Sequence, residues 1–373
     1  MRRGTKIQKL KQALPGIVKD VRHYAKPRVK LHNEGLGDYY TEGYRSLNQR
    51  EWKGVRDTAY DFASWLKVYG YMAVTLGKHP VALTKSFVRY PWMASYLTVA
   101  NMLDRHKLGL RGKQLRYTQE QFYGVVHNSV DVIAKIIERD ENLNSPNNKR
   151  AAKLRAKTVM FDEMTPSIIM AGFPMLDWID IAMSPVCLPG EVDQNANIMY
   201  VDAAERMGLA ADVCPLPSAE VGCAIVDDYP QVGSSFITSS MPCDGSLGAA
   251  LFMDRYMKKL PSFTLTPPQR FNEPETNAYA VKDLKNCIRF IEETYDVKWD
   301  WDAFWKKAEE YNKTTQCMLD KWDVNCTPYP QVIGSALSLQ REYEFQTAAC
   351  LDSFMTKQDE KVTKMMLKGY EED

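Results

Sequence analysis

The sequence predicts an α/β protein with large helical additions, in which a parallel, Rossmann-like sheet is flanked by N- and C-terminal helical regions. Two observations lead to this fold class. Between residues 158 and 268, short apolar or β-branched runs alternate with helical stretches, which is typical of parallel strands joined by crossover helices. Before and after this part, apolar residues recur at helical spacing over longer stretches. We therefore predict three regions, at 1–157, 158–268 and 269–373.

The first region is predicted to be helical, with helices over 48–76, 91–103 and 118–140. Gly77 and Pro80 break the chain after the first helix. Pro91 suits the start of the second helix, where its missing N–H leaves no hydrogen bond unmade. The polar stretch 142–149 contains a proline and is the best candidate for a linker.

The middle region is predicted to alternate between strands and helices. Strands are expected over 167–172, 234–239 and 262–266, and helices over 176–183, 196–207, 218–227 and 247–259. The run SSFITS at 234–239 has the β-branched and aromatic centre that strands favour. The last region is predicted to hold long helices over 275–296, 300–322 and 332–368.

The overall charge balance excludes bulk electrostatic attraction to nucleic acid or to anionic lipid. The formal net charge is +1, so no strong field surrounds the protein. The first thirty residues are locally basic, which we interpret as a solvated face or a tether. No run reaches the roughly 18 apolar residues of a membrane-spanning helix, and no apolar core of signal-peptide type is present near the start. We expect a cytoplasmic protein.

The eight cysteines all lie at or after Cys187, whereas the five histidines all lie at or before His127. A large chain without an export signal does not favour a disulfide framework. A metal site built within the second half would therefore depend on thiolates, with or without carboxylates.

Two cysteines are placed where a metal centre is plausible. Cys214, in ADVCPLPSAE, precedes a predicted helix, and Cys243, in SSMPCDGS, follows a predicted strand and precedes another helix. Loops of this kind meet at one edge of a parallel sheet, and helix N-termini favour thiolates. Cys187, in SPVCLPGE, is a third candidate. The alternative is that these thiols are small packing residues near a core.

Four segments in order carry a resemblance to a known family. They are GFPMLDWIDIAM at 172–183, MYVDAAERMGLAADVC at 199–214, SSFITSSMPCDGS at 234–246, and a paired-helix stretch at 282–314. With this order and spacing, residues from about 168 to 372 resemble the first half of the iron–sulfur subunits of 2-hydroxyacyl-CoA dehydratases and the related benzoyl-CoA reductases.

The resemblance implies that Cys214 and Cys243 are ligands of a [4Fe–4S] cluster. The alternative is that this chain holds its cluster differently from the family, with Cys187 as a ligand. It also implies an acyl-CoA substrate, a separate ATP-dependent iron–sulfur activator, and a ketyl-radical elimination of water from a 2-hydroxyacyl-CoA. A third cysteine ligand is expected from a second α/β unit, in a second dehydratase subunit or a missing half. Leu176 stands where the family usually carries a glutamate. A ring-reducing enzyme and a non-catalytic scaffold subunit are the alternatives.

Overall fold

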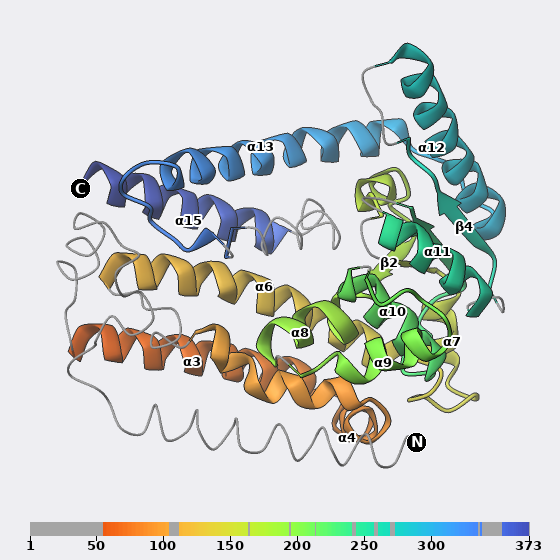
Figure 1. Cartoon of the computed structure of the whole chain (residues 1–373), viewed down its shortest axis with the longest axis horizontal. Coiled ribbons are helices and arrows are strands. Elements are labelled where there is room, and N and C mark those ends of the chain that lie inside the picture. Colours follow the sequence, from red (N-terminus) through yellow and green to blue (C-terminus); the bar gives the residue numbers. More distant parts are fainter. Residues whose placement is uncertain are drawn as a thin grey trace.

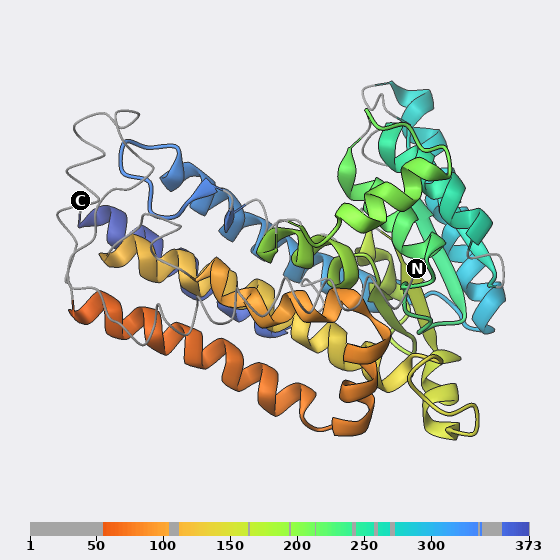
Figure 2. The same cartoon turned by 60° about the horizontal axis from the view of Figure 1, so that its bottom comes forward.

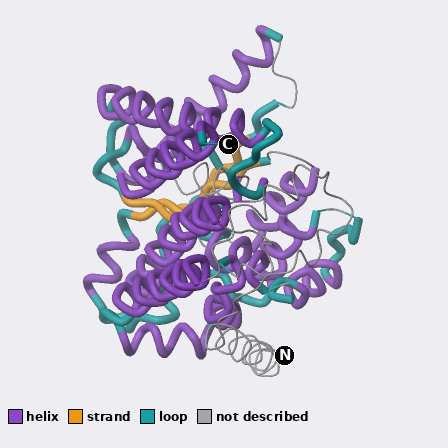
Figure 3. The backbone as a smooth tube through the Cα atoms, turned by 90° about the vertical axis from the view of Figure 1, so that its left-hand side faces the viewer, coloured by secondary structure: helices purple, strands orange, loops and turns teal. Residues whose placement is uncertain are grey.

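The computed structural model describes residues 55–103, 112–162, 165–193, 195–212, 214–240, 244–256, 260–268, 273–334, 336–337 and 353–372. Within these residues, a layer of long helices lies beside an α/β unit that contains one four-stranded sheet (Figure 1). The strands run through the interior, with helices on both sides of them (Figure 3). The predicted fold class is confirmed.

The sheet consists of β1 (Thr158–Phe161), β2 (Asp177–Asp180), β3 (Ser235–Ser239) and β4 (Ser262–Leu265), in the order β2-β1-β3-β4. All three strand pairs are parallel. Met160 and Phe236 point into one hydrophobic cluster, whereas Phe161 and Ile237 point into another. Because side chains alternate along a strand, the sheet is covered on both faces, as parallel sheets usually are.

Different helices cover the two faces. Residues of α9 (Ile198–Arg206), α10 (Pro215–Ile225) and α11 (Asp244–Tyr256) belong to the first cluster. The second cluster is formed with the 3-10 helix η3 (Ser167–Gly172) and with α12 (Pro274–Tyr295). The short helix α7 (Lys149–Arg155) leads into β1, and the Asn148 side chain accepts a hydrogen bond from the Ala151 N–H at its start.

Most of the other helices come from both ends of the described chain and form one layer. They are α3 (Val55–Leu76), α4 (Pro80–Arg89), the 3-10 helix η2 (Pro91–Met102), α6 (Gly112–Arg139), α13 (Trp301–Asn325) and α15 (Ser353–Glu371). The α6 helix packs between α3 and α15, and α15 packs in turn against α13 (Figure 1). None of the described helices combines the length and the apolar character that a membrane span requires.

Two sequence predictions about local structure are wrong. The run 167–172, predicted as a strand, is the 3-10 helix η3, and the stretch 176–183, predicted as a helix, contains strand β2. Burial explains the first error, because a short buried apolar run has the same pattern in a strand and in a helix. Two further elements, β1 and α4, lie where no element was predicted, and the stretch 91–103 is a 3-10 helix.

A buried carboxylate connects three helices of the layer. Glu120 on α6 accepts hydrogen bonds from Tyr60 on α3 and from Gln358 and Lys361 on α15. Lys67 on α3 pairs with the same carboxylate at 3.0 Å. Burial raises the pKa of Glu120, but the hydrogen bonds from Lys361 and Gln358 and the charge of Lys67 outweigh it and lower the pKa to about 2.

This lowered pKa makes the stability of the helical layer sensitive to acid. Because the folded-state pKa lies below the ordinary value of 4.5, Glu120 stabilises the fold above that pH, and the contribution is lost as the pH falls toward 2. Between about pH 5 and pH 2.5, wild type is expected to lose on the order of 2 kcal/mol more unfolding free energy than Glu120→Gln. Urea unfolding at several pH values measures this difference, and parallel curves for the two proteins would contradict it.

Candidate metal centre

The carboxyl ends of the four strands meet at one edge of the sheet, here called the carboxyl edge. Asp162 directly follows β1 and its N–H donates to the Ile237 carbonyl of β3 at 3.0 Å. The Ser240 N–H, just after β3, donates to the Leu265 carbonyl of β4 at 2.9 Å. Asp180 is the last residue of β2. In open parallel sheets, ligands usually bind beyond this edge.

Cys214 is placed at this end of the α/β unit by α10. It is the N-cap residue of α10, and its side chain is exposed. Because α10 leads the chain back to the start of β3, the N-terminus of α10 points toward the carboxyl edge. Pro215 and Pro217 restrict the backbone of the first turn. The Ser218 hydroxyl donates to the Cys214 carbonyl at 3.0 Å, which fixes the residue in place.

Cys243 lies outside the described residues, but the helix that follows it is described. The first residue of α11 is Asp244, and α11 packs against α10. A Cβ atom added to Gly248, in the second turn of α11, would lie 3.8 Å from Leu209 Cδ1. Leu209 belongs to the loop that leads to Cys214. The second turn of α11 therefore lies next to Leu209, five residues before Cys214. That Cys214 and Cys243 lie on neighbouring loops stays a prediction.

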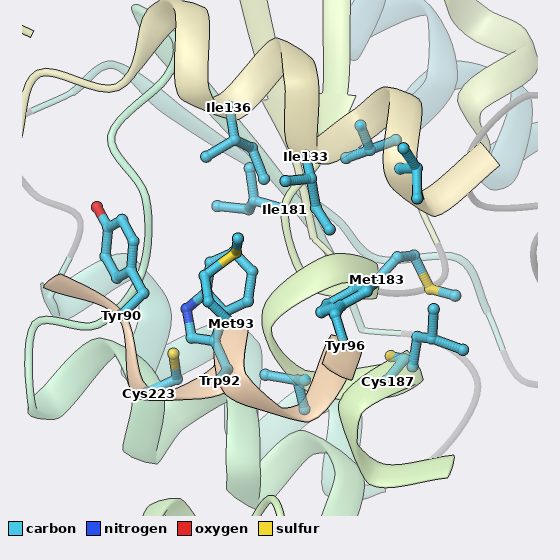
Figure 4. Close-up of a cluster of buried hydrophobic side chains, with 14 of the residues drawn as sticks. Tyr90, Trp92, Met93, Tyr96, Ile133, Ile136, Ile181, Met183, Cys187 and Cys223 are labelled. Atoms are coloured by element: carbon cyan, nitrogen blue, oxygen red, sulfur yellow. The ribbon is translucent and has the colours of Figure 1, made fainter. Parts of the chain in front are cut away.

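Cys187 is placed differently from Cys214. It ends the π-helical turn η4 (Met183–Cys187), which continues into α8 (Leu188–Val192). Its side chain is 6% exposed and belongs to the first hydrophobic cluster. Figure 4 shows Cys187 beside Tyr96 and Met183, while Cys223 of α10 lies at the other end of the same cluster. The apolar surroundings of Cys187 are typical of a packing residue.

The polar residues beneath the carboxyl edge were not predicted from the sequence. The hydroxyl of Tyr229 donates to Asp162 Oδ1 at 3.3 Å, and both residues are buried. Burial, then the negative charges of Asp162 and Glu220, raise the pKa of Tyr229 well above its ordinary value, so the phenol stays protonated. Asp180 Oδ1 accepts hydrogen bonds from the Ala182 and Met183 N–H groups and so starts the η4 turn.

These residues position the site without themselves forming a metal cage. Within the described parts of the chain, no group of three or more His, Cys, Asp or Glu residues is arranged to hold a metal ion. Cys243 lies outside the described residues, so a site that includes it would extend beyond them. Leu176 packs against the second hydrophobic cluster before β2.

The loop before Cys214 is held by an unusually close contact between α9 and α10. A Cβ atom added to Gly222 on α10 would lie 1.7 Å from the Tyr200 carbonyl oxygen on α9. Because that oxygen belongs to the backbone, a side chain at position 222 must push the two helices apart. We expect Gly222→Ala to destabilise the protein by about 3 kcal/mol.

The control is Gly70→Ala on α3, where an added Cβ meets nothing within 4 Å. Removing a helix-interior glycine there is expected to be neutral or stabilising by up to about 1 kcal/mol. Urea denaturation compares the two variants. Equal effects of the two substitutions would show that α9 and α10 do not approach each other as closely as described.

The fold and the site define a class of protein: a parallel α/β unit in which cysteine-bearing loops precede helices that lie beside the carboxyl edge. Comparison with protein families identifies the class more narrowly. Residues 192–359 match the family 2-hydroxyglutaryl-CoA dehydratase, D-component. This segment is similar to the 2-hydroxyacyl-CoA dehydratase family, which confirms the predicted resemblance. No curated protein matches the chain.

The matched segment contains three of the four sequence pieces that carry the resemblance, including Cys214 and Cys243. The first piece, at 172–183, precedes it. There the structure departs from the expected strand followed by a helix, because the piece contains β2.

Proposed function

We propose that this chain is the iron–sulfur component of a 2-hydroxyacyl-CoA dehydratase and that Cys214 and Cys243 are thiolate ligands of its [4Fe–4S] cluster. The observation that carries the proposal is the position of Cys214: an exposed thiol at the N-terminus of α10, a helix that packs against α11, and within the family match. The donor set suits the group, because iron–sulfur clusters are held by cysteine thiolates. When bound, such a cluster supplies single electrons at low potential.

The chain's own residues hold Cys214 and close the α/β unit beneath it. The prolines of the α10 first turn and the Ser218 hydrogen bond fix Cys214, and the close α9–α10 contact fixes the loop before it. The buried Tyr229–Asp162 pair lies under the carboxyl edge, where the protonated phenol holds the carboxylate. In this proposal Cys187 is a packing residue, because its side chain lies among apolar neighbours.

The proposal requires partners. Two thiolates leave cluster positions to be completed by a second subunit or by residues beyond those described. A separate ATP-dependent iron–sulfur protein supplies the electron, and the reaction removes water from a 2-hydroxyacyl-CoA to give a 2-enoyl-CoA. The dehydratase description of the matched family favours this reaction over reduction of an aromatic ring.

Product analysis tests the proposed reaction. The chain is combined under anaerobic conditions with its partner subunit and the ATP-dependent activator, and is offered either a 2-hydroxyacyl-CoA or benzoyl-CoA. We expect a 2-enoyl-CoA from the first and no conversion of the second. A cyclic diene from benzoyl-CoA would identify a ring reductase. If this chain binds no iron and its partner proteins are equally active without it, the chain is a scaffold subunit.

A further inference from the structure

The outward side of α13 carries large apolar residues where a helix that faces water normally carries charges. Its inward side, with Thr314, Met318 and Val324, is buried. On the opposite side, seven uncharged residues follow one another at alternating intervals of four and three positions. This set, here called the α13 stripe, consists of Trp301, Trp305, Ala308, Asn312, Thr315, Leu319 and Trp322. Such spacing is the heptad repeat of a helix that packs along its length against a second helix.

The largest residues of the α13 stripe are well exposed. Trp301 is 53% exposed, Trp305 59%, Leu319 52% and Trp322 37%. The rings of Trp301 and Trp305 are stacked, with their centroids 6.4 Å apart. Figure 1 and Figure 2 both show α13 along one edge of the helical layer, with α15 next to it. Because soluble monomers rarely expose a contiguous apolar surface of this kind, the stripe indicates an interaction surface.

The area of the stripe is sufficient for a specific interface. Its three tryptophans and its leucine together expose on the order of 400 Å² of apolar surface, since a whole tryptophan side chain has about 200 Å². Each partner in a standard protein–protein interface buries about 800 Å², of which somewhat more than half is apolar. The stripe therefore supplies the apolar centre of such an interface, and the charged residues beside it supply the polar rim.

The order of residues along the stripe makes it complementary to a second copy of itself that runs in the opposite direction. When Asn312 of one copy lies beside Thr315 of the other, Ala308 of one copy lies opposite Leu319 of the other. The two polar residues then meet each other at the centre, where an amide and a hydroxyl can form a hydrogen bond. The smallest residue of the stripe faces a large one, so the packing between the helices stays even.

Other arrangements of two copies fit less well. A shift by one heptad toward the start of α13 would place Trp322 against Lys298, whose side chain is 87% exposed and would lose contact with water. A parallel pair would place Ala308 against Ala308 and leave a gap between the helices. The antiparallel register instead brings Trp305 of one copy to Trp322 of the other.

The charges on one flank of the stripe also agree with this register. Lys306 and Asp323 are both exposed and lie on the same flank of α13. In an antiparallel pair this flank lies beside its own copy, and Lys306 of one copy comes within about 3 Å of Asp323 of the other along the helix axis. Asp302 precedes Lys306 by four residues, so the same lysine also lies beside a carboxylate of its own helix.

We propose that the α13 stripe is the contact surface between two copies of this chain, which pack their α13 helices as an antiparallel pair about a two-fold axis between Asn312 and Thr315. A two-fold contact uses the same surface on both copies and closes at two, so the expected assembly is a dimer. This inference uses no residue of the candidate metal centre and does not depend on the proposed dehydratase function.

Analytical ultracentrifugation of the full chain over a range of concentrations tests the dimer. We expect wild type to form a dimer and Leu319→Asp to associate on the order of 100-fold more weakly, because the two-fold axis makes each substitution act twice. The circular dichroism spectrum of Leu319→Asp should match that of wild type, since Leu319 is exposed within a single chain. Val281→Asp on α12 changes an equally exposed apolar residue and should leave association unchanged.

Charge reversal tests whether the flanks meet. Lys306→Glu should weaken association about tenfold at low salt, and added salt should reduce this difference, because two attractive contacts become repulsive. Lys285→Glu reverses the charge of an exposed lysine on α12 and should have no effect. If Lys306→Glu and Lys285→Glu associate equally well, the antiparallel register is wrong.

Crosslinking with a short bismaleimide tests the register directly. An equal mixture of Ala308→Cys and Leu319→Cys chains should give a product that joins positions 308 and 319. Ala308→Cys chains alone should give no product between the two introduced cysteines, since these lie about 16 Å apart along the axis. A wild-type chain that is monomeric at every concentration, a dimer that Leu319→Asp leaves intact, or the absence of the 308–319 product would each overturn the inference.

Discussion

Cys214→Ser is expected to remove iron from the protein and to lower dehydratase activity by at least about 100-fold, since even residues that only support metal ligands contribute 10- to 100-fold. A serine hydroxyl is a poor replacement for a thiolate, and Cys214 is exposed, so the fold should be unaffected. The measurements are iron and acid-labile sulfide after anaerobic purification, and turnover of a 2-hydroxyacyl-CoA with the partner proteins.

Cys326→Ser is the matched control. Cys326 is also exposed, but it lies at the C-terminal end of α13 in the helical layer. It should retain iron and activity at the wild-type level. If Cys214→Ser behaves in the same way as Cys326→Ser, then Cys214 is not a ligand.

The second large effect concerns stability. Lys321 on α13 and Asp359 on α15 form an ion pair in which both side chains are 0% exposed. Asp359→Ala would leave an ammonium group buried without this counter-charge, and removing one partner of a buried pair typically costs about 3–5 kcal/mol. We expect a loss of this size in the free energy of unfolding, measured by urea denaturation.

The exposed pair Lys364–Glu360 on the same helix provides the control, at 3.8 Å with side chains 78% and 46% exposed. Glu360→Ala should cost no more than about 0.5 kcal/mol. Replacing both buried partners, by Lys321→Met with Asp359→Leu, should recover most of the loss, because no charge is then left in the interior. A similar cost for Asp359→Ala and Glu360→Ala would show that Lys321 and Asp359 are not buried together.

Strong periodicity made much of the fold predictable from the sequence. The strand at 234–239 and the helices at 275–296 and 300–322 were predicted close to their observed bounds, because their patterns are long or rich in β-branched and aromatic residues. The region 158–183 was not predictable in this way. Its strands have only four residues each, and β2 begins and ends with aspartate. One of these, Asp177, pairs with Lys135 and Arg139 of α6, a long-range contact that the local pattern does not contain.

The candidate site was predictable only where it depends on local sequence. A cysteine before a proline and a helical pattern indicated the position of Cys214, which the structure places at the N-terminus of α10. The Tyr229–Asp162 contact joins residues 67 positions apart. The position of Asp162 at the carboxyl edge can be predicted only once β1 is recognised as a strand. The burial of Cys187 likewise depends on tertiary packing, since its neighbour Tyr96 comes from a distant helix.

Thiol alkylation of the anaerobic, iron-loaded protein, mapped residue by residue with mass spectrometry, tests the assignment of Cys214 and Cys243 most directly. If both thiols bind iron, they are protected together and become reactive together after a chelator removes the metal, while Cys326 reacts in both states. Alkylation of Cys214 at the rate of Cys326 before and after chelation would contradict the assignment.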